Sequence, residues 1–209
     1  MTDLRQTGIR WADRADDAAV AAYLASVLEG GGPKSIAVPG GRTPGPIFAE
    51  LARHPLAWDQ LSITLTDDRL VPADHPANNF RLLTETLGAT GAQLSPLVEG
   101  AAVEPFDLVW LGMGADGHIA SIFPGCEPAD DLPPSVVRAR PDPLPPEAPF
   151  ERLTLTLAAL TATRQIMLVV RGAEKRAVLE AAIAGRSSLP IARLLRAARC
   201  PVDLFWSAS

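Results

Sequence analysis

The sequence contains few residues of the kinds that build disulfide scaffolds and metal centres. Its 209 residues include two cysteines, Cys126 and Cys200, and three histidines, His54, His75 and His118. Neither cysteine has a second metal ligand at a characteristic spacing, and the histidines are scattered rather than paired as in zinc hydrolases. We therefore expect two reduced thiols and no bound metal.

Long apolar runs, a leader-like N-terminus and an excess of positive charge are also lacking. No apolar run approaches the roughly 20 residues that a membrane-spanning helix needs. Residues 1–17 are charged and lack the apolar middle of a signal peptide. We therefore expect a cytoplasmic protein with no membrane partner. The formal net charge of −5 gives no indication of a nucleic-acid surface.

Lysine is scarce as well. Lys34 and Lys175 are the only lysines among 19 lysine and arginine residues. An acidic chain that binds an anion must gather its cations locally, because its overall field repels the ligand. A lysine at a motif position is therefore more informative here than in an average sequence.

Short apolar runs alternate along the chain with segments of helical periodicity, in which apolar residues recur every three to four positions. Runs that are apolar on both faces are typical of parallel strands covered on both sides. We therefore predict a Rossmann-like α/β fold, with a mostly parallel sheet and helices on both faces, in a single domain over 1–209. The predicted strands are 35–38, 61–66, 106–112, 151–157, 165–170 and 202–206, with an edge strand at 135–139 in the proline-rich segment 128–149; the predicted helices are 13–29, 45–53, 77–88 and 173–185.

Four motifs with unusual residues each begin where a predicted strand ends. They are "GGRTP" at 40–44, "DDR" at 67–69, "GMGADGH" at 112–118 and "RGAEK" at 171–175. Ligands of open α/β sheets bind at the carboxyl ends of the strands. If the strands are parallel, all four motifs lie along one edge of the sheet, and this shared position indicates a binding site more strongly than any one motif.

The first motif has the composition of an anion-binding turn. Gly40 and Gly41 permit close backbone approach, and Thr43 and Pro44 are suited to cap and begin a helix. The N-terminus of such a helix and the guanidinium group of Arg42 would both attract phosphate. The alternative is a tight turn that binds nothing.

The second motif joins two acids to an arginine. Asp67 is a candidate to orient a water molecule or a histidine, and Arg69 to meet negative charge on a substrate, whereas Asp68 should face the opposite side. A surface salt-bridge cluster is the alternative. Downstream, Asn78 and Asn79 are good helix-capping residues, and either could bind a sugar hydroxyl.

The third motif places a histidine after a glycine-rich loop that includes Gly114 and Gly117. Free N–H groups of such a loop could stabilise an oxyanion. A histidine side chain has a reference pKa of about 6.5, so the neutral form of His118 could take a proton from water, with Asp116 holding the ring or the water in place. The alternative is a structural histidine at the start of a helix. We expect a helix to begin near His118, so that Ser121, one turn further on, is a helix residue and not a nucleophile.

In the fourth motif Lys175 falls in the first turn of a predicted helix. Lysine is unfavourable there because the helix dipole prefers anions at that end, and a bound anion would remove the conflict.

Dinucleotide binding is a weak alternative, since "GMGADG" resembles G-x-G-x-x-G but lacks the acid expected about 20 residues further on. The chain also has no nucleophilic serine of the G-x-S-x-G type.

Taken together and in this order, "GGRTP", "DDRLVP" with "NNF", "LGMGADGHIASIFPG", "ERLTLTLAAL" and "RGAEK" resemble the 6-phosphogluconolactonase family. The resemblance implies a fold like that of glucosamine-6-phosphate deaminase and ribose-5-phosphate isomerase. It also implies a carboxylic ester hydrolase that converts 6-phospho-D-glucono-1,5-lactone to 6-phosphogluconate, the second step of the pentose phosphate pathway, without a metal or other cofactor. The partner would be this small phosphosugar, and the protein would be a monomer or weak homodimer.

By matching positions, the resemblance implies that His118 is the general base and that Asp116 belongs to its motif. Asp67 and Arg69 match the Asp and Arg of the family's Asp-Glu-Arg, and Lys175 matches the lysine of its Gly-x-x-Lys.

The remaining matches include two departures from the family pattern. Arg42 lies in the phosphate-side loop. Asp68 replaces the middle Glu of Asp-Glu-Arg, and Pro39 stands where a serine is common.

Two other functions remain as alternatives. An amino-sugar phosphate deaminase or isomerase would share the Gly-Gly and Asp-Glu strand ends, although its histidine motif reads differently from "DGHIASIFPG". A non-catalytic sugar-phosphate sensor would normally carry a DNA-binding segment, and this sequence shows no basic helix-turn-helix-like stretch.

Overall fold

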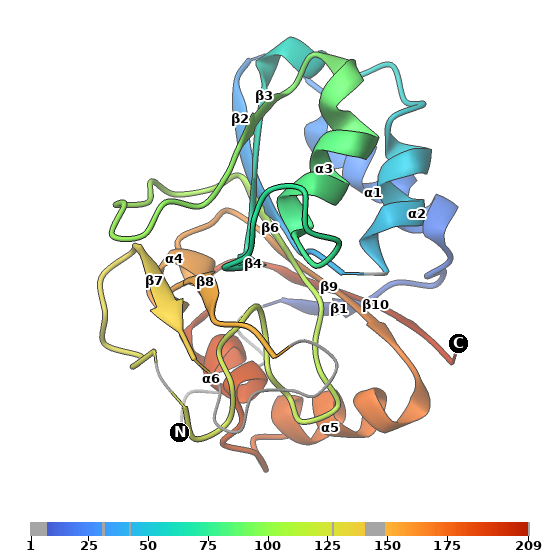
Figure 1. Cartoon of the computed structure of the whole chain (residues 1–209). Helices are drawn as coiled ribbons and strands as arrows, with labels where there is room; N and C mark the ends of the chain where they lie inside the picture. Colours follow the sequence, from blue (N-terminus) through green and yellow to red (C-terminus); the bar gives the residue numbers. More distant parts are fainter. Residues whose placement is uncertain (1–7, 31, 42, 127, 141–148, 209) are drawn as a thin grey trace.

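The fold is organised around one parallel sheet. The computed structural model describes residues 8–30, 32–41, 43–126, 128–140 and 149–208. Seven strands lie side by side in the order β1-β10-β9-β6-β2-β3-β5, and every neighbouring pair is parallel (Figure 1). These strands are β1 (Ile9–Trp11), β2 (Lys34–Val38), β3 (Leu61–Leu65), β5 (Gln93–Ser95), β6 (Leu108–Leu111), β9 (Ile166–Arg171) and β10 (Val202–Ser207).

Helices cover both faces of this sheet. One face packs against α1 (Asp17–Leu28), α2 (Pro44–Leu51) and α3 (Asn79–Leu87), and the other against α4 (Leu157–Thr161), α5 (Ala173–Ile183) and α6 (Pro190–Ala197). Alternate residues of a strand enter alternate cores: Met167 and Val169 face the first helix layer, and Leu168 the second. The expectation of strands buried on both faces is confirmed.

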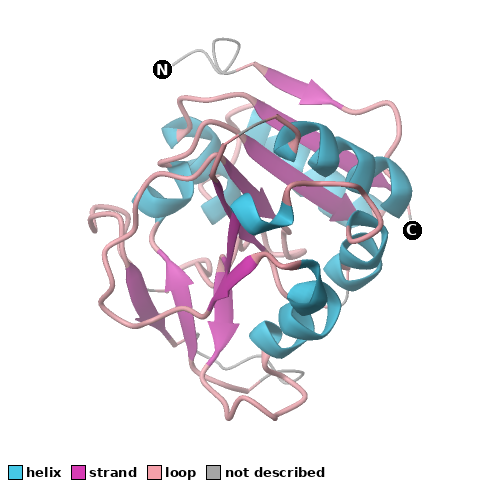
Figure 2. Cartoon of the chain, turned by 90° about the horizontal axis from the view of Figure 1, so that it is seen from above, coloured by secondary structure: helices cyan, strands magenta, loops and turns pink. Residues whose placement is uncertain are grey.

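A second, smaller sheet stands beside the first (Figure 2). It is antiparallel, in the order β4 (Asp67–Arg69), β8 (Arg152–Leu155), β7 (Val136–Ala139). Thr66 joins the two sheets, since its N–H donates to Val38 O at 2.8 Å and its carbonyl accepts from Leu155 N at 2.9 Å.

The second sheet corrects three expectations. The segment "DDR" is not a loop after a strand but a strand itself. The strand predicted at 151–157 and the edge strand predicted at 135–139 both exist, yet they belong to this antiparallel sheet and not to the parallel one. The part of the proline-rich segment at 141–148 lies outside the described residues.

The helix predicted to begin near His118 is absent. Residues 113–125 form turns, with an isolated bridge between Ile119 and Ile122 and a φ of 47° at Ala120. A left-handed residue with a side chain is incompatible with a continuing α-helix. Strands β1 and β5 and helices α4 and α6 were not predicted from the sequence.

Candidate active site

The four motifs meet where the order of the strands reverses. After β2 the chain adds β3 and β5 on one side of it, and then crosses to add β6 and β9 on the other. A switch of this kind leaves a crevice at the carboxyl ends of the two strands that flank it, here β2 and β6. Gly40 follows β2, the histidine loop follows β6, Asp67 follows β3 and Lys175 follows β9. The prediction that the motifs share one sheet edge is confirmed.

A small polar cavity of about 100 Å³ lies at this crevice. Its lining includes three predicted residues, Gly40 and Thr43 from the glycine turn after β2 and Lys175 from the start of α5. Pro44 is the first residue of α2, as predicted, whereas the Thr43 side chain makes no capping hydrogen bond. Arg42, predicted to bind phosphate beside them, lies outside the described residues.

The electrostatics of this cavity favour an anion. Lys175 lies in the first turn of α5, as predicted, and within the described chain no ion pair or hydrogen bond engages its ammonium group. The N-termini of α2 and α5 both border the cavity, and each adds a partial positive charge. This combination is typical of a phosphate site.

Two side chains on the cavity wall that carry N–H groups, Arg171 and Trp110, were not predicted from the sequence. Arg171 pairs with Asp17 at 3.2 Å through Nη2, while its buried Nη1 has no partner among the described residues. Trp110 is 1% exposed, and its indole N–H is also unpartnered in that part of the chain. An arginine that ends the otherwise apolar strand β9 was a usable signal for Arg171.

The histidine is held by the acid of its own motif. His118 Nδ1 lies 2.6 Å from Asp116 Oδ1, which also accepts the His118 backbone N–H at 3.2 Å. When Nδ1 carries the proton and donates it to the carboxylate, Nε2 keeps a free lone pair. The ring packs against Phe123 at 4.7 Å between centroids, and its side chain is 34% exposed. It therefore combines a fixed orientation with access to water.

The glycines of this loop make room and do not offer free donors. A Cβ at Gly114 would lie 2.2 Å from His118 Nδ1 and 2.5 Å from Asp116 Oδ1, so a side chain at position 114 would displace this pair. The Gly114 N–H donates to His118 O at 2.9 Å, and the Gly117 N–H donates to Gly114 O at 3.0 Å. Both donors are used inside the loop, so in this conformation neither is available to an oxyanion, contrary to our expectation.

Asp67 ties the strand β4 to the end of the histidine loop. Its Oδ2 accepts from Ser121 Oγ at 2.6 Å, and Ser121 N donates to Thr154 Oγ1 at 3.2 Å. Ser121 is fully buried, and it is a loop residue and not the helix residue we expected. The two long-range bonds fix the loop against the second sheet, which makes Asp67 an anchor of the loop.

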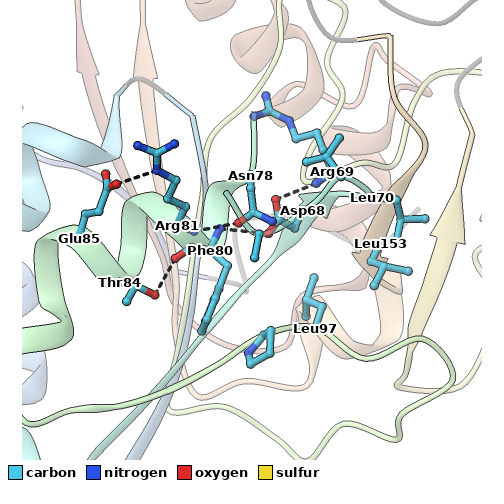
Figure 3. Close-up of a pocket in the computed structure, with 13 residues that line it drawn as sticks. Asp68, Arg69, Leu70, Asn78, Phe80, Arg81, Thr84, Glu85, Leu97 and Leu153 are labelled. Carbon is cyan, nitrogen blue, oxygen red and sulfur yellow. Dashed lines mark hydrogen bonds and ion pairs between the residues drawn. The ribbon is translucent and has the colours of Figure 1, made fainter. Parts of the chain in front are cut away.

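Asp68 lies in the interior between β4 and α3, as Figure 3 shows. Its carboxylate accepts from the backbone N–H groups of Arg69 at 2.7 Å, Asn79 at 2.7 Å and Phe80 at 3.0 Å. Burial raises the pKa of Asp68, and the three N–H groups oppose that rise. A cavity of about 570 Å³ adjoins this carboxylate, and its apolar lining includes Leu70, Leu97 and Leu153 (Figure 3).

Arg69 keeps its charge available. Its Nη1 donates to two neutral oxygens, Ala77 O at 3.0 Å and Asn79 Oδ1 at 2.8 Å, and no carboxylate within the described ranges forms an ion pair with it. Arg69, Gly41 and Asn79 also line a cavity of about 860 Å³ between the α2 and α3 starts. Of the two asparagines, Asn78 is the helix cap, since its Oδ1 accepts from Arg81 N.

The described residues lack two further kinds of site, a metal-binding cluster and a membrane-spanning helix. They contain no cluster of three or more His, Cys, Asp or Glu side chains placed to hold a metal ion. None of their helices is both long and apolar enough to cross a membrane.

Comparison with known proteins gives consistent results over nearly the whole chain. The sequence model of the family described as "Glucosamine-6-phosphate isomerases/6-phosphogluconolactonase" matches residues 12–96 and 89–206. A 6-phosphogluconolactonase of Rhizobium meliloti is 34% identical, with 92% of each chain covered. The crystal structure of a 6-phosphogluconolactonase from Shewanella baltica superposes with a TM-score of 0.81 at 32% identity, covering 98% of this chain and 99% of the other.

A monomeric glucosamine-6-phosphate deaminase superposes almost as well. Its TM-score is 0.79 at 15% identity, with coverage of 97% of this chain and 98% of the other. At that identity the likeness shows a shared fold alone. The Rossmann-like α/β prediction is confirmed by both structures.

Proposed function

Because the chain belongs to the glucosamine-6-phosphate isomerase/6-phosphogluconolactonase family, we propose that it hydrolyses 6-phospho-D-glucono-1,5-lactone to 6-phosphogluconate, the second step of the oxidative pentose phosphate pathway. The observation that carries this assignment is the His118–Asp116 pair, partly exposed on the loop after β6, whose first residues Gly112 and Met113 also line the cationic cavity. A fixed base beside an anion site suits an ester that carries a phosphate.

The phosphate would bind in the small cavity. Lys175 and the N-termini of α2 and α5 would neutralise it, with Arg171 as a further cation on the wall. Arg42, which the sequence predicts to bind phosphate, would be a further cation of this site. Since the phosphate is remote from C1 of the lactone, its binding energy would serve to fix the ring in front of the base.

The reaction would proceed by direct attack of water. His118 Nε2 removes a proton as the water oxygen bonds to C1 of the lactone, and Asp116 stabilises the imidazolium that forms. Arg69 is the candidate to meet the oxyanion, because its guanidinium is paired only with neutral oxygens among the described residues. The tetrahedral intermediate then expels the ring oxygen, which takes the proton from His118 and becomes a hydroxyl group.

This scheme needs no covalent intermediate. General-base assistance is worth about 10²–10⁴-fold, and positioning with oxyanion stabilisation would supply the remainder. The proposed partner is accordingly one small phosphosugar, and we expect a monomer or weak homodimer without nucleic acid.

The test is a substrate comparison. Lactone freshly generated from glucose 6-phosphate is followed by proton release at neutral pH, against its spontaneous hydrolysis, and ammonia release from glucosamine 6-phosphate is measured in parallel. Catalysed lactone loss without ammonia supports the assignment. Ammonia release with lactone loss at the spontaneous rate would replace it with the deaminase alternative.

A further inference from the structure

We infer that Asn79 is a positioning residue that couples the glycine turn of the phosphate site to Arg69, so that an occupied phosphate site sets the arginine for catalysis. The inference rests on the proposed function and extends it. It concerns a residue that the sequence indicated as a helix cap or a sugar contact. Both roles are weakened by its place in the structure, because Asn79 is 6% exposed and its amide is engaged by protein groups.

The link runs through a single oxygen. Asn79 Oδ1 accepts from Gly41 N at 3.1 Å and from Arg69 Nη1 at 2.8 Å, while Nδ2 donates weakly to Asp67 O at 3.4 Å. The same amide fills the space over Gly40, where a Cβ would lie 2.0 Å from Asn79 Cγ. Two segments 28 residues apart, the glycine turn and strand β4, therefore meet on one side chain.

The backbone of Asn79 is itself rigidly held. Its N–H donates to Asp68 Oδ1. The N–H groups of Phe80 and Arg69 donate to Asp68 Oδ2 and Oδ1, respectively (Figure 3). The start of α3 and strand β4 are therefore bonded directly to each other. Because the Asn79 backbone is fixed to Asp68, a shift of the glycine turn would act on Arg69 through the Asn79 amide.

The neutrality of the amide matters as much as its position. A carboxylate at this place would accept the same two hydrogen bonds but would neutralise Arg69, as ion pairs between Arg and carboxylate do. The amide orients the guanidinium and leaves its charge for the substrate. Position 79 thus combines two requirements, an acceptor for two donors and the absence of charge, that asparagine meets.

The experiment separates the two halves of the substrate. D-glucono-1,5-lactone, which lacks the phosphate, is hydrolysed in a phosphate-free buffer with and without added inorganic phosphate. Wild-type protein should be activated by phosphate, within the range of about 5–150-fold typical of coupling between sites. In Asn79→Ala the activation ratio should fall to about one, even at saturating phosphate.

The matched control is Asn78→Ala, which removes the cap of the same helix and leaves the link to Gly41 and Arg69 in place. Its activation ratio should equal that of wild type. A purely structural role for Asn79 would instead lower both rates of Asn79→Ala and preserve the ratio, and this result would overturn the inference. The inference would also be overturned if inorganic phosphate binds to the wild-type protein but does not raise its rate of lactone hydrolysis.

A second variant covers the case in which Asn79→Ala does not fold. Asn79→Asp keeps the shape and both acceptor contacts, so it should keep the ratio but lower turnover by about 10²-fold, the cost of removing one oxyanion donor. Wild-type turnover in Asn79→Asp would refute the inference. A wild-type protein that fails to hydrolyse the phosphorylated lactone refutes the proposed function and this inference together; one that hydrolyses it, with a ratio unchanged in Asn79→Ala, refutes the inference alone.

Discussion

Adding one methyl group at Gly114 should lower catalysis by displacing the base, His118, which itself is left unmutated. A Cβ there would lie 2.2 Å from His118 Nδ1, 2.3 Å from Cε1 and 2.5 Å from Asp116 Oδ1, whereas ordinary contacts of a Cβ begin at 3.4 Å. The imidazole of Gly114→Ala would have to move by more than about 1 Å, and a displacement of about 1 Å at a reacting group costs roughly 10²-fold in rate.

The expected loss of kcat is therefore about 10²–10⁴-fold, up to the full worth of a general base. The side chains of His118 and Asp116 are 34% and 50% exposed, so they have room to rotate outward and the fold should tolerate the change. Steady-state lactone hydrolysis measures kcat, and urea unfolding measures stability. Gly88→Ala is the control, because its Cβ would meet Thr84 at 3.5 Å, an ordinary contact. A kcat of Gly114→Ala within threefold of wild type would refute the geometry described for this loop.

Three further changes address other parts of the site. Lys175→Ala should raise KM about 10–100-fold and change kcat little, since a hydrogen bond to a charged group is worth about 1.5–3 kcal/mol; an unaltered KM would place the phosphate elsewhere. Ser121→Ala leaves Asp67 Oδ2 without its 2.6 Å donor and should lower the free energy of unfolding by about 1–3 kcal/mol, as measured by urea titration. An unchanged free energy of unfolding would show that the loop is not anchored by this hydrogen bond. Burial raises the pKa of Asp68, so the folded state binds a proton more tightly than the unfolded state, and the contribution of this carboxyl to stability falls as pH rises through its folded pKa. The free energy of unfolding of wild type minus that of Asp68→Asn should thus decrease from about pH 4 upward, and a difference that grows with pH would contradict the burial argument.

The parallel sheet could be predicted because each of its central strands carries its own signal. The strand at Ile166–Arg171 is an apolar run whose side chains enter both cores, and Gly172 follows it. The edge strands at Ile9–Trp11 and Gln93–Ser95 have three residues each, too few for a periodic pattern. For α6 a signal existed, Pro190 at the first position and apolar residues at helical spacing after it.

Strand β4 and the turns after β6 could not be predicted from local sequence. Asp67–Arg69 has low intrinsic strand preference, and it is a strand because it pairs with Arg152–Leu155. The stretch from His118 reads as a helix start, but the left-handed conformation of Ala120 turns the chain so that Ser121 reaches Asp67.

Within the site, the separation along the chain decided what could be predicted. The His118–Asp116 contact joins residues two positions apart and was expected from the motif. The contacts between Asp67 and Ser121, 54 positions apart, and between Gly41 and Asn79, 38 positions apart, depend on how the sheets and α3 pack. The shared edge of the motifs could be predicted because it follows from the parallel order of the strands.

The most direct measurement is the turnover of freshly generated lactone by His118→Ala, compared with wild type under conditions in which both proteins are shown to be folded. If the imidazole takes the proton from water, kcat falls about 10²–10⁴-fold while KM stays nearly constant, because the phosphate contacts are intact. A kcat close to that of wild type would contradict the account.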